Sequence, residues 1–542
     1  MTQHQPIPTA SSRPIARQPH AVVIGSGFGG LATAVRLGAR GYRVTVLERL
    51  DCPGGRARVF RQDGFTFDAG PTILTLPHLL DDLWALCGRD RAAEVPLVEM
   101  DPFYRIRFND GSYIDCSGDP DKMRAEIARL SPGDVEGYER LLASTEEKFR
   151  FGFERLGRME FSSIFTMLRE LPGIALRGGH RTVAGGVRRY VKDERLRTAL
   201  SYHPLLIGGN PHGTTAIYLL ILALERKWGV HSAMGGTGAL IQGLVSLVEG
   251  QGNTVRLGAD VAEILIDKGA AKGVRLADGE TIPADIVVSN ADAAWTWRHL
   301  IPARYRRRWT DAKIDRARYS MGLFVWYFGT DRQYPEIQHH SMVLGPRYRG
   351  LLNDIFRRHE LADDFSIYLH RPTATDPSLA PEGCDTFYAL VPVPHLDGET
   401  DWARATQGFK ARVRARLEET VLPDLGDHVI SERILTPREF ESDYLAYKGA
   451  GFSLEPTLFQ SAWFRPHNRA EGIDRLWFVG AGTHPGAGVP GVLTSAEVVD
   501  RMIPPADTLL GAAPDPSPTP STRPTRSPIG SPIAAERRVA EL

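Results

Sequence analysis

Three glycines near the N-terminus, Gly25, Gly27 and Gly30, have the G-x-G-x-x-G spacing of a dinucleotide-binding turn. Gly25 permits a tight turn, Gly27 lets the backbone approach a pyrophosphate, and Gly30 allows a helix to pack closely on a strand. Glu48 follows about 20 residues later, where a carboxylate accepts hydrogen bonds from the ribose hydroxyls. Together these four residues predict a dinucleotide site.

The surrounding sequence predicts the elements that position these residues. Residues 21–24 and 43–47 are apolar runs typical of buried strands, and residues 28–40 carry apolar side chains at helical spacing. In such a strand–helix–strand unit the pyrophosphate lies at the helix N-terminus, where free N–H groups and the helix dipole favour negative charge.

Two nearby segments suit other parts of the same ligand. Gly54, Gly55 and Arg56 combine flexible backbone with a guanidinium whose forked donors match a diphosphate. Residues 64–72 alternate like a strand and then break at Gly70 and Pro71. This break would bring backbone against a flat ring system.

A second glycine-rich turn lies near the C-terminus. Residues 476–479 predict a strand, followed by Gly480 and Gly482 and by a helix from about Pro490. The positive end of that helix would face an electron-rich ring such as a reduced flavin. Pro485 stands where a second fingerprint would need its third glycine. One full fingerprint favours FAD over NAD, and the electrons would then leave to another acceptor, such as oxygen or a membrane quinone.

Composition excludes several classes of function. The 542 residues allow two or three domains, and 42% hydrophobic residues with a formal net charge of +0 argue against nucleic acid as the main partner. The four cysteines (Cys52, Cys87, Cys116 and Cys384) lack metal-ligand spacing, so we predict no metal site and a reducing, cytoplasmic setting. The first 19 residues lack the apolar core of a signal peptide, and no run reaches the roughly 18 apolar residues of a spanning helix.

With both glycine-rich ends considered, the chain resembles the bacterial-type phytoene desaturases, FAD enzymes of the amine-oxidase-like flavoprotein superfamily. The resemblance extends from about Val22 to Met502 and rests on residues 25–31, 53–56, 65–72, 205–211, 228–230, 235–239, 365–370, 391–395, 460–469 and 479–491. The most specific blocks are Trp-Phe-Arg-Pro-His-Asn-Arg at 463–469 and Gly-Thr-His-Pro-Gly-Ala-Gly at 482–488.

The resemblance and the periodicities together predict an α/β fold. It has a Rossmann-type FAD-binding domain, like that of amine oxidases and glutathione reductase, interleaved with an α+β substrate domain and a helical region. We predict FAD-binding segments at 20–115, 228–300 and 470–503, a helical, substrate- or membrane-facing region at 116–227, and a substrate domain at 301–469. Residues 254–289 are expected to form a small antiparallel meander that returns to a parallel strand. Residues 1–19 and the Pro-rich residues 504–542 are expected to be a disordered leader and tail.

The resemblance implies the reaction and its site. Phytoene, a C40 hydrocarbon, would receive successive double bonds to give neurosporene or lycopene, by hydride transfer to the flavin and proton loss. It would enter a long apolar tunnel from the bilayer, so the protein is expected at the cytoplasmic surface of the inner membrane. The family positions are Gly25, Gly27, Gly30, Glu48, Gly55 and Arg56 for the ADP portion, Val261 for the adenine, and Ala69, Gly70, Pro71, Thr72, Gly482, Thr483, Val489, Pro490 and Gly491 for the flavin.

No catalytic side chain is assigned, because His203, His467 and His484 are each expected to be structural. Two alternatives stay open. Besides phytoene desaturation, the chain could act as a desaturase or oxygenase of a later acyclic carotenoid of the hydroxy- or methoxyneurosporene type, or as a non-catalytic prenyl-lipid carrier of the same fold. Intact glycine fingerprints and Glu48 argue against the carrier.

Overall fold

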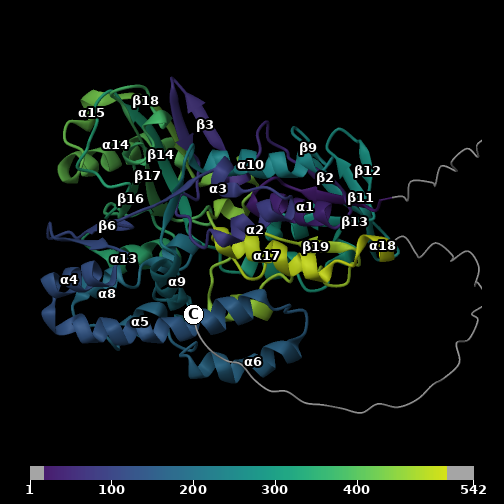
Figure 1. The fold of residues 1–542 in the computed structure, drawn as a ribbon, viewed down its shortest axis with the longest axis horizontal. Helices are drawn as coiled ribbons and strands as arrows, with labels where there is room; N and C mark the ends of the chain where they lie inside the picture. The colour runs from purple at the N-terminus through teal and green to yellow at the C-terminus, as the bar shows by residue number, and fades with distance from the viewer. Residues whose placement is uncertain (1–17, 510–542) are drawn as a thin grey trace, which may run out of the picture.

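The computed structural model describes residues 18–509, and its centre is a five-stranded parallel sheet of order β19-β13-β1-β2-β9 (Figure 1). The strands are β1 (His20–Ile24), β2 (Arg43–Leu47), β9 (Thr254–Arg256), β13 (Ile286–Ser289) and β19 (Leu476–Phe478). Ile24 pairs with both Leu47 and Ser289, so the carboxyl ends of the strands share one edge. Ligands of parallel α/β sheets bind at this edge, and the predicted Rossmann-type fold is confirmed.

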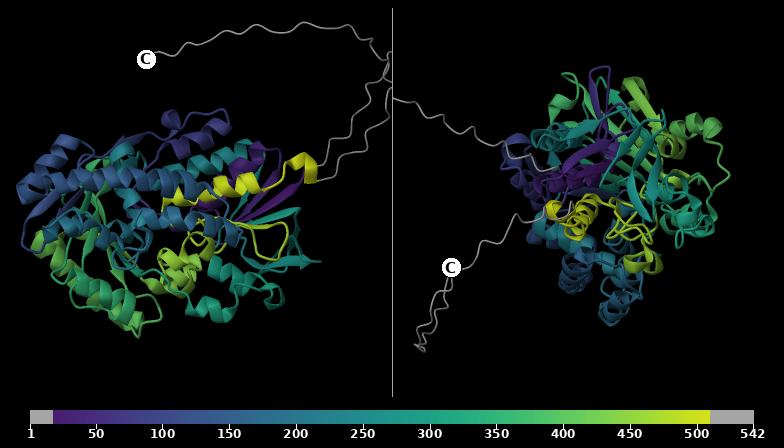
Figure 2. Two further views of the ribbon diagram at one scale, coloured as in Figure 1. Left: turned by 90° about the horizontal axis from the view of Figure 1, so that it is seen from below. Right: turned by 90° about the vertical axis from the view of Figure 1, so that its right-hand side faces the viewer.

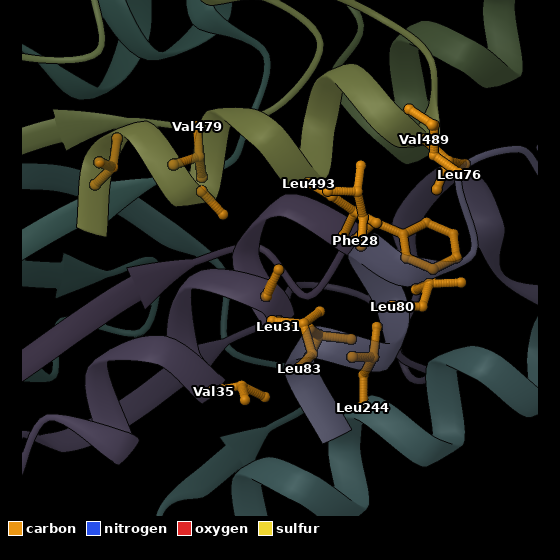
Figure 3. Packing of buried hydrophobic residues seen from close by; sticks show 14 of the residues in the cluster. Phe28, Leu31, Val35, Leu76, Leu80, Leu83, Leu244, Val479, Val489 and Leu493 are labelled. Carbon is orange, nitrogen blue, oxygen red and sulfur yellow. The ribbon is translucent and has the colours of Figure 1, made fainter. Parts of the chain in front are cut away.

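One face of this sheet is covered by helices. α1 (Phe28–Ala39) packs against α2 (His78–Leu86), α10 (Gly236–Gly250) and α17 (Val489–Met502). Figure 3 shows the contact, with Leu31 of α1 close to Leu83 of α2 and Phe28 close to Leu493 of α17. This buried cluster fixes the N-terminus of α1 relative to that of α17.

The other face carries the antiparallel sheet of β10 (Val261–Asp267), β11 (Ala270–Leu276) and β12 (Thr281–Pro283), which is the predicted meander. The prediction was wrong for residues 254–257, because Thr254–Arg256 instead forms the parallel edge strand β9 beside β2.

A second, seven-stranded sheet has the order β18-β14-β17-β16-β15-β6-β7. Its strands are β6 (Tyr104–Arg107), β7 (Tyr113–Cys116), β14 (Gly322–Thr330), β15 (His340–Val343), β16 (Ile367–His370), β17 (Asp385–Val393) and β18 (Val429–Leu435). Helix α14 (Trp402–Thr420) covers one face through Trp402 and Phe409, which pack on Phe324. β6 and β7 were predicted within the FAD-binding segment 20–115. The structure instead places both strands in this second sheet, because β6 pairs with β15 and β7 pairs with β6.

The helical region lies along the lower side of Figure 1 and contains α4 (Pro120–Leu130), α5 (Val135–Phe149), α6 (Ile164–Leu176), α7 (Val183–Val187), α8 (Glu194–Ala199) and α9 (Leu220–Trp228). There are also two two-stranded antiparallel sheets: β3 (Val59–Gln62) forms a hairpin with β4 (Phe65–Asp68), and β5 (Leu97–Glu99) pairs with the distant β8 (His231–Ala233). The shorter helices are α3 (Arg91–Glu94), α11 (Ala293–Trp295), α12 (Asp311–Arg316), α13 (Tyr348–Asn353), α15 (Leu425–His428), α16 (Pro437–Tyr444) and α18 (Ala506–Leu509). The remaining domain boundaries stay predictions.

The two described ends lie at the same end of the molecule (Figure 2). Residues 504–509 were predicted to belong to the disordered tail, but residues 506–509 form α18, and the Tyr42 hydroxyl donates a hydrogen bond to the Pro504 carbonyl at 2.7 Å. The rest of the predicted leader and tail, residues 1–17 and 510–542, lies outside the described residues. Among residues 18–509, no helix has both the length and the apolar character needed to span a bilayer.

Candidate functional site

A single cavity of about 550 Å³ begins at the carboxyl edge of the parallel sheet and continues to the seven-stranded sheet. Most of the predicted site residues line it: Gly25, Gly27, Glu48, Gly55, Arg56, Ala69, Gly70, Pro71, Thr72, Val261, Gly482, Val489, Pro490 and Gly491. The fold therefore brings together segments that lie more than 400 residues apart in the chain.

Gly30 and Thr483 do not line the cavity. A Cβ on Gly30 would overlap the carbonyl oxygen of Gly25, so this glycine permits close packing of α1 on the preceding turn. Thr483 is fully buried, and its hydroxyl donates a hydrogen bond to the Pro466 carbonyl at 2.7 Å. Both residues therefore hold loops that border the cavity without lining it themselves.

Glu48 is held firmly at one end of the cavity. Its Oε2 atom accepts hydrogen bonds from the Ser26 backbone N–H at 2.9 Å and from the Ser26 hydroxyl at 2.7 Å. Its Oε1 atom accepts one from the Leu50 N–H at 3.0 Å. An ionised carboxylate has about four acceptor positions, so Glu48 keeps acceptor capacity for a ligand hydroxyl.

Two glycine turns meet beside Glu48. The Gly54 N–H donates to the Ser26 carbonyl at 3.1 Å, and Gly54 and Gly55 have φ angles of 112° and 54°. A Cβ on Gly55 would lie 3.8 Å from the Cα of Gly27, so bare backbone faces bare backbone across the opening. Backbone that is free of side chains, beside a helix N-terminus, suits an anionic diphosphate.

Asn290 and Asp292 belong to this region, and sequence reasoning missed them. A Cβ on Gly27, Gly29 or Gly480 would lie 2.9, 2.5 or 2.7 Å from the side-chain amide of Asn290, so the glycines leave room for that amide. The Oδ2 atom of Asp292 is buried without a hydrogen-bond partner, 3.9 Å from Arg56. Asn290 directly follows the buried strand β13 and Asp292 comes two residues later. Polar residues just after a buried strand were the signal in the sequence that could have identified them.

The loop 69–72 is fixed on the seven-stranded sheet by hydrogen bonds. The Thr72 hydroxyl lies 2.6 Å from the Tyr388 hydroxyl and 3.1 Å from the Tyr368 hydroxyl, and the Tyr327 hydroxyl donates to the Ala69 carbonyl at 2.8 Å. Burial raises the pKa of Tyr388 and of Tyr327 well above the ordinary value. These phenols therefore stay neutral and hold the loop rigidly.

Three buried histidines, His339, His340 and His370, gather behind this loop, with one nitrogen of each within 4.8 Å of the others. Burial lowers the pKa of all three, that of His339 to about 4, with a further contribution from the charge of Arg371. A divalent cation here would lie beside that guanidinium in a desolvated environment. We therefore interpret the cluster as a neutral hydrogen-bonded group, in which His340 Nδ1 lies 2.7 Å from the Tyr368 hydroxyl.

The C-terminal turn approaches the cavity from the opposite side. α17 begins at Val489 with Pro490 in its first turn, and the preceding Gly488 has a φ of 94°. The buried Arg465 donates hydrogen bonds to the carbonyls of Ala481 at 2.9 Å and Leu454 at 3.1 Å. Arg465 thus supports the glycine-rich turn.

The far half of the cavity is apolar. Val325, Met342 and Leu390 of the seven-stranded sheet line one side, and helices α6 and α9 contribute the other side through Met167, Ile174, Ile221 and Leu224. The cavity can therefore hold a charged dinucleotide in one half and a long hydrocarbon next to it in the other half. Such an arrangement suits redox chemistry on an apolar substrate.

Comparison with known proteins agrees with this geometry. Residues 28–499 match the family model described as flavin containing amine oxidoreductase. A phytoene desaturase (neurosporene-forming) of Cereibacter sphaeroides is 50% identical over 92% of this chain and 96% of its own length. A phytoene desaturase (lycopene-forming) of Pseudescherichia vulneris is 46% identical over 89% of this chain and 98% of its own length. The chain belongs to the phytoene desaturases of the flavin-containing amine oxidoreductase family. It is therefore an oxidoreductase of a flavoprotein family.

Solved structures support the fold of this desaturase. An oxidoreductase from Methanosarcina mazei superposes with a TM-score of 0.61 at 20% identity, over 89% of this chain and all of its own. Cyclohexylamine oxidase from Brevibacterium oxydans superposes with a TM-score of 0.60 at 15% identity, over 90% of this chain and 99% of its own. Such low identities establish the shared architecture, and the substrate must be argued from the site.

Proposed function

We propose that the flavin is FAD and that it lies along the glycine-lined half of the cavity. The free acceptor capacity of Glu48 would bind the ribose hydroxyls, and the opposed turns at Gly27 and Gly55 would leave room for the pyrophosphate beside Arg56. Val261 would meet the adenine through its backbone. The loops 69–72 and 482–491 would contact the flavin ring from two sides, with Thr483 holding its loop from behind.

The substrate that the site supports best is phytoene, and the protein would introduce successive double bonds into it. The carrying observation is the continuity of one cavity from the dinucleotide end into an apolar half. The neurosporene-forming relative is somewhat more similar to this chain than the lycopene-forming one, at 50% against 46% identity. Neurosporene is therefore the product that we propose, with lycopene as the alternative.

Within this reaction FAD supplies the hydride acceptor, and the chain supplies orientation and a dry environment. The aliphatic side chains of the apolar half would align the hydrocarbon along the tunnel and exclude water. The hydroxyl network around Thr72 would keep the loop 69–72 at a fixed position beside the reacting carbons.

The test is reconstitution of the purified protein with FAD and phytoene in liposomes, followed by absorption spectroscopy. We expect an FAD-dependent shift of absorption into the visible range, whose band positions report the number of new double bonds. Bound FAD without any spectral change would refute phytoene as the substrate. Turnover under oxygen or with an added quinone then tests the two predicted electron acceptors.

A membrane-docking surface follows from helix α6, which is apolar on two faces. Met167 and Ile174 face the cavity, whereas the side chains of Phe165 and Leu176 are 77% and 81% exposed. Leu168 and Leu171 on the same helix and Phe459 beside it are also exposed, and α6 contacts the segment Ala462–Phe464, whose Ala462 lines the cavity. We call Phe165, Leu168, Leu171, Leu176 and Phe459 the apolar rim.

The apolar rim is proposed to rest on the bilayer so that phytoene enters the cavity directly between α6 and residues 458–462. Residues 150–181 carry six arginines against three glutamates, but five of these arginines form ion pairs with Glu146, Glu147, Glu170 or Glu497, so the apolar rim and not the charge carries this proposal. In Figure 1, α6 lies at the lower edge of the molecule, away from both sheets.

Vesicle co-sedimentation tests this surface. L168E should weaken binding to phosphatidylcholine vesicles containing phosphatidylglycerol by about tenfold, since a charge replaces a leucine that would enter the interface. I430E is the matched control, because Ile430 is 54% exposed on β18 in the other sheet. Equal loss of binding in both variants would refute the assignment of the apolar rim.

A further inference from the structure

Glu225 of α9 is the one charged side chain that reaches the apolar half of the cavity among the described residues. The other charged lining residues, Glu48, Arg49, Arg56, Asp260, Asp292 and Asp443, all belong to the dinucleotide half. Glu225 instead lies with Tyr202, Leu206 and Ile221, in the part proposed to hold the hydrocarbon.

Two side chains hold this carboxylate in place. The Tyr104 hydroxyl donates to Oε1 at 2.7 Å, and His203 Nε2 lies 3.0 Å from Oε2. Glu225 is only 4% exposed, and within residues 18–509 it has no ion pair with a lysine or arginine. Burial and the neighbouring Glu225 charge raise the pKa of Tyr104 well above its ordinary value, so this phenol stays a neutral donor.

A buried carboxylate without a full cationic partner is costly, typically by several kcal/mol. A glutamine would satisfy the same two neighbours without that cost. The side chains behind Glu225 are neutral. The Tyr104 ring lies 5.9 Å from the ring of His340, and burial lowers the pKa of His340 well below normal. Among residues 18–509 the one ion-pair partner of Glu225 is His203, and the carboxylate also lines the cavity, where its negative charge would act on whatever occupies that space.

We propose that Glu225 stabilises positive charge on the hydrocarbon and accepts the proton released during desaturation. This inference rests on the function proposed above. One C–H bond of the saturated carbon pair breaks with its electrons leaving as hydride to the oxidised flavin. The neighbouring C–H bond then breaks, its electrons form the new C=C bond, and its proton passes to a Glu225 oxygen. Oxygen or a quinone later takes the two electrons, and the proton leaves to solvent.

The first experiment measures charge recognition without turnover. The FAD-loaded protein is titrated with octyltrimethylammonium, and with its neutral isostere 2,2-dimethyldecane, while the rise in Tm reports binding. We expect E225Q to bind the ammonium at least tenfold more weakly than the wild type and to bind the hydrocarbon equally well. D354N is the control, because Asp354 is a buried acid outside the cavity, paired with Arg347 and Arg358. Equal ammonium affinity in wild type and E225Q would overturn the proposal.

The second experiment measures anaerobic flavin bleaching by phytoene in a single turnover. E225Q should slow bleaching by about 100-fold or more, the usual contribution of a general base, whereas D354N should not. E225D should fall between wild type and E225Q in both assays, and it serves alone if E225Q does not fold. Unchanged bleaching in these variants would refute the role of Glu225. Absence of bleaching in the wild type would instead refute phytoene as the substrate, and the ammonium titration would still decide the cation site.

Discussion

Gly70 lies where the two loops that are proposed to hold opposite ends of the cofactor pack against each other, and replacing it tests that packing. A Cβ on Gly70 would lie 2.6 Å from the carbonyl oxygen of Arg56, and both residues line the cavity. Backbone atoms cannot rotate away as a flexible side chain can, so the loops 54–57 and 69–72 must separate by about half an ångström to restore a normal carbon–oxygen contact.

The expected result of G70A follows from that displacement. Overpacking of this kind costs about 1–3 kcal/mol, so the free energy of unfolding of the FAD-free protein should fall by that amount in urea. A misplacement of about 1 Å near a reacting centre costs about 100-fold in rate, so half of that displacement should cost about tenfold in the bleaching rate and should weaken FAD binding, measured by flavin fluorescence.

G408A is the matched control for G70A. Gly408 lies exposed in the middle of α14 with no neighbouring atom within 4 Å of an added Cβ. The same substitution should there stabilise the protein by about 0.5–1 kcal/mol through helix propensity and leave flavin affinity unchanged. If G70A were as stable as the wild type and bound FAD equally well, the proposed contact between the two loops would be wrong.

Three further predictions address other parts of the site. E48Q should raise the dissociation constant of FAD by about tenfold or more, since hydrogen bonds to a charged group contribute about 1.5–3 kcal/mol. The control in the fluorescence titration is E136Q, at an exposed glutamate on α5. Equal FAD affinity in both variants would contradict the role of Glu48. Burial raises the pKa of Asp68 from 3.8 to about 6, so its stabilising contribution is complete below about pH 4 and is lost as pH rises through 6. Urea unfolding should therefore show the wild type losing stability relative to D68N over that range. Parallel pH profiles of the two proteins would refute the raised pKa of Asp68. G29A should destabilise the protein because its Cβ would lie 2.5 Å from Asn290 Oδ1, and the loss of unfolding free energy should be smaller in an N290A background. Additive losses in the double-mutant cycle would disprove the contact between residues 29 and 290.

Local sequence determined the dinucleotide half of this protein well. The residues at 21–48 specify a strand, a glycine turn, a helix and a second strand within one continuous stretch, and each part restricts the next. The same holds for 476–491, where the strand, the turn and the Pro490 helix start are consecutive. Glu48 was predictable because its distance from the first glycine follows from this short unit.

Only the tertiary structure decided the rest of the site. β6 lies in the seven-stranded sheet because it pairs with β15, about 240 residues away, and β7 joins the sheet by pairing with β6; no local pattern specifies the partner β15. Asn290 fills space between glycines of two segments that lie about 450 residues apart in the chain, and Arg465 supports a turn that it does not adjoin in sequence. Glu225 sits within a helix whose sequence gives no sign of a ligand, and its meaning comes from Tyr104, His203 and an apolar cavity assembled from distant elements. Spacing along the chain encodes turns and helices because those depend on near neighbours, whereas the environment of a buried charge depends on everything that folds around it.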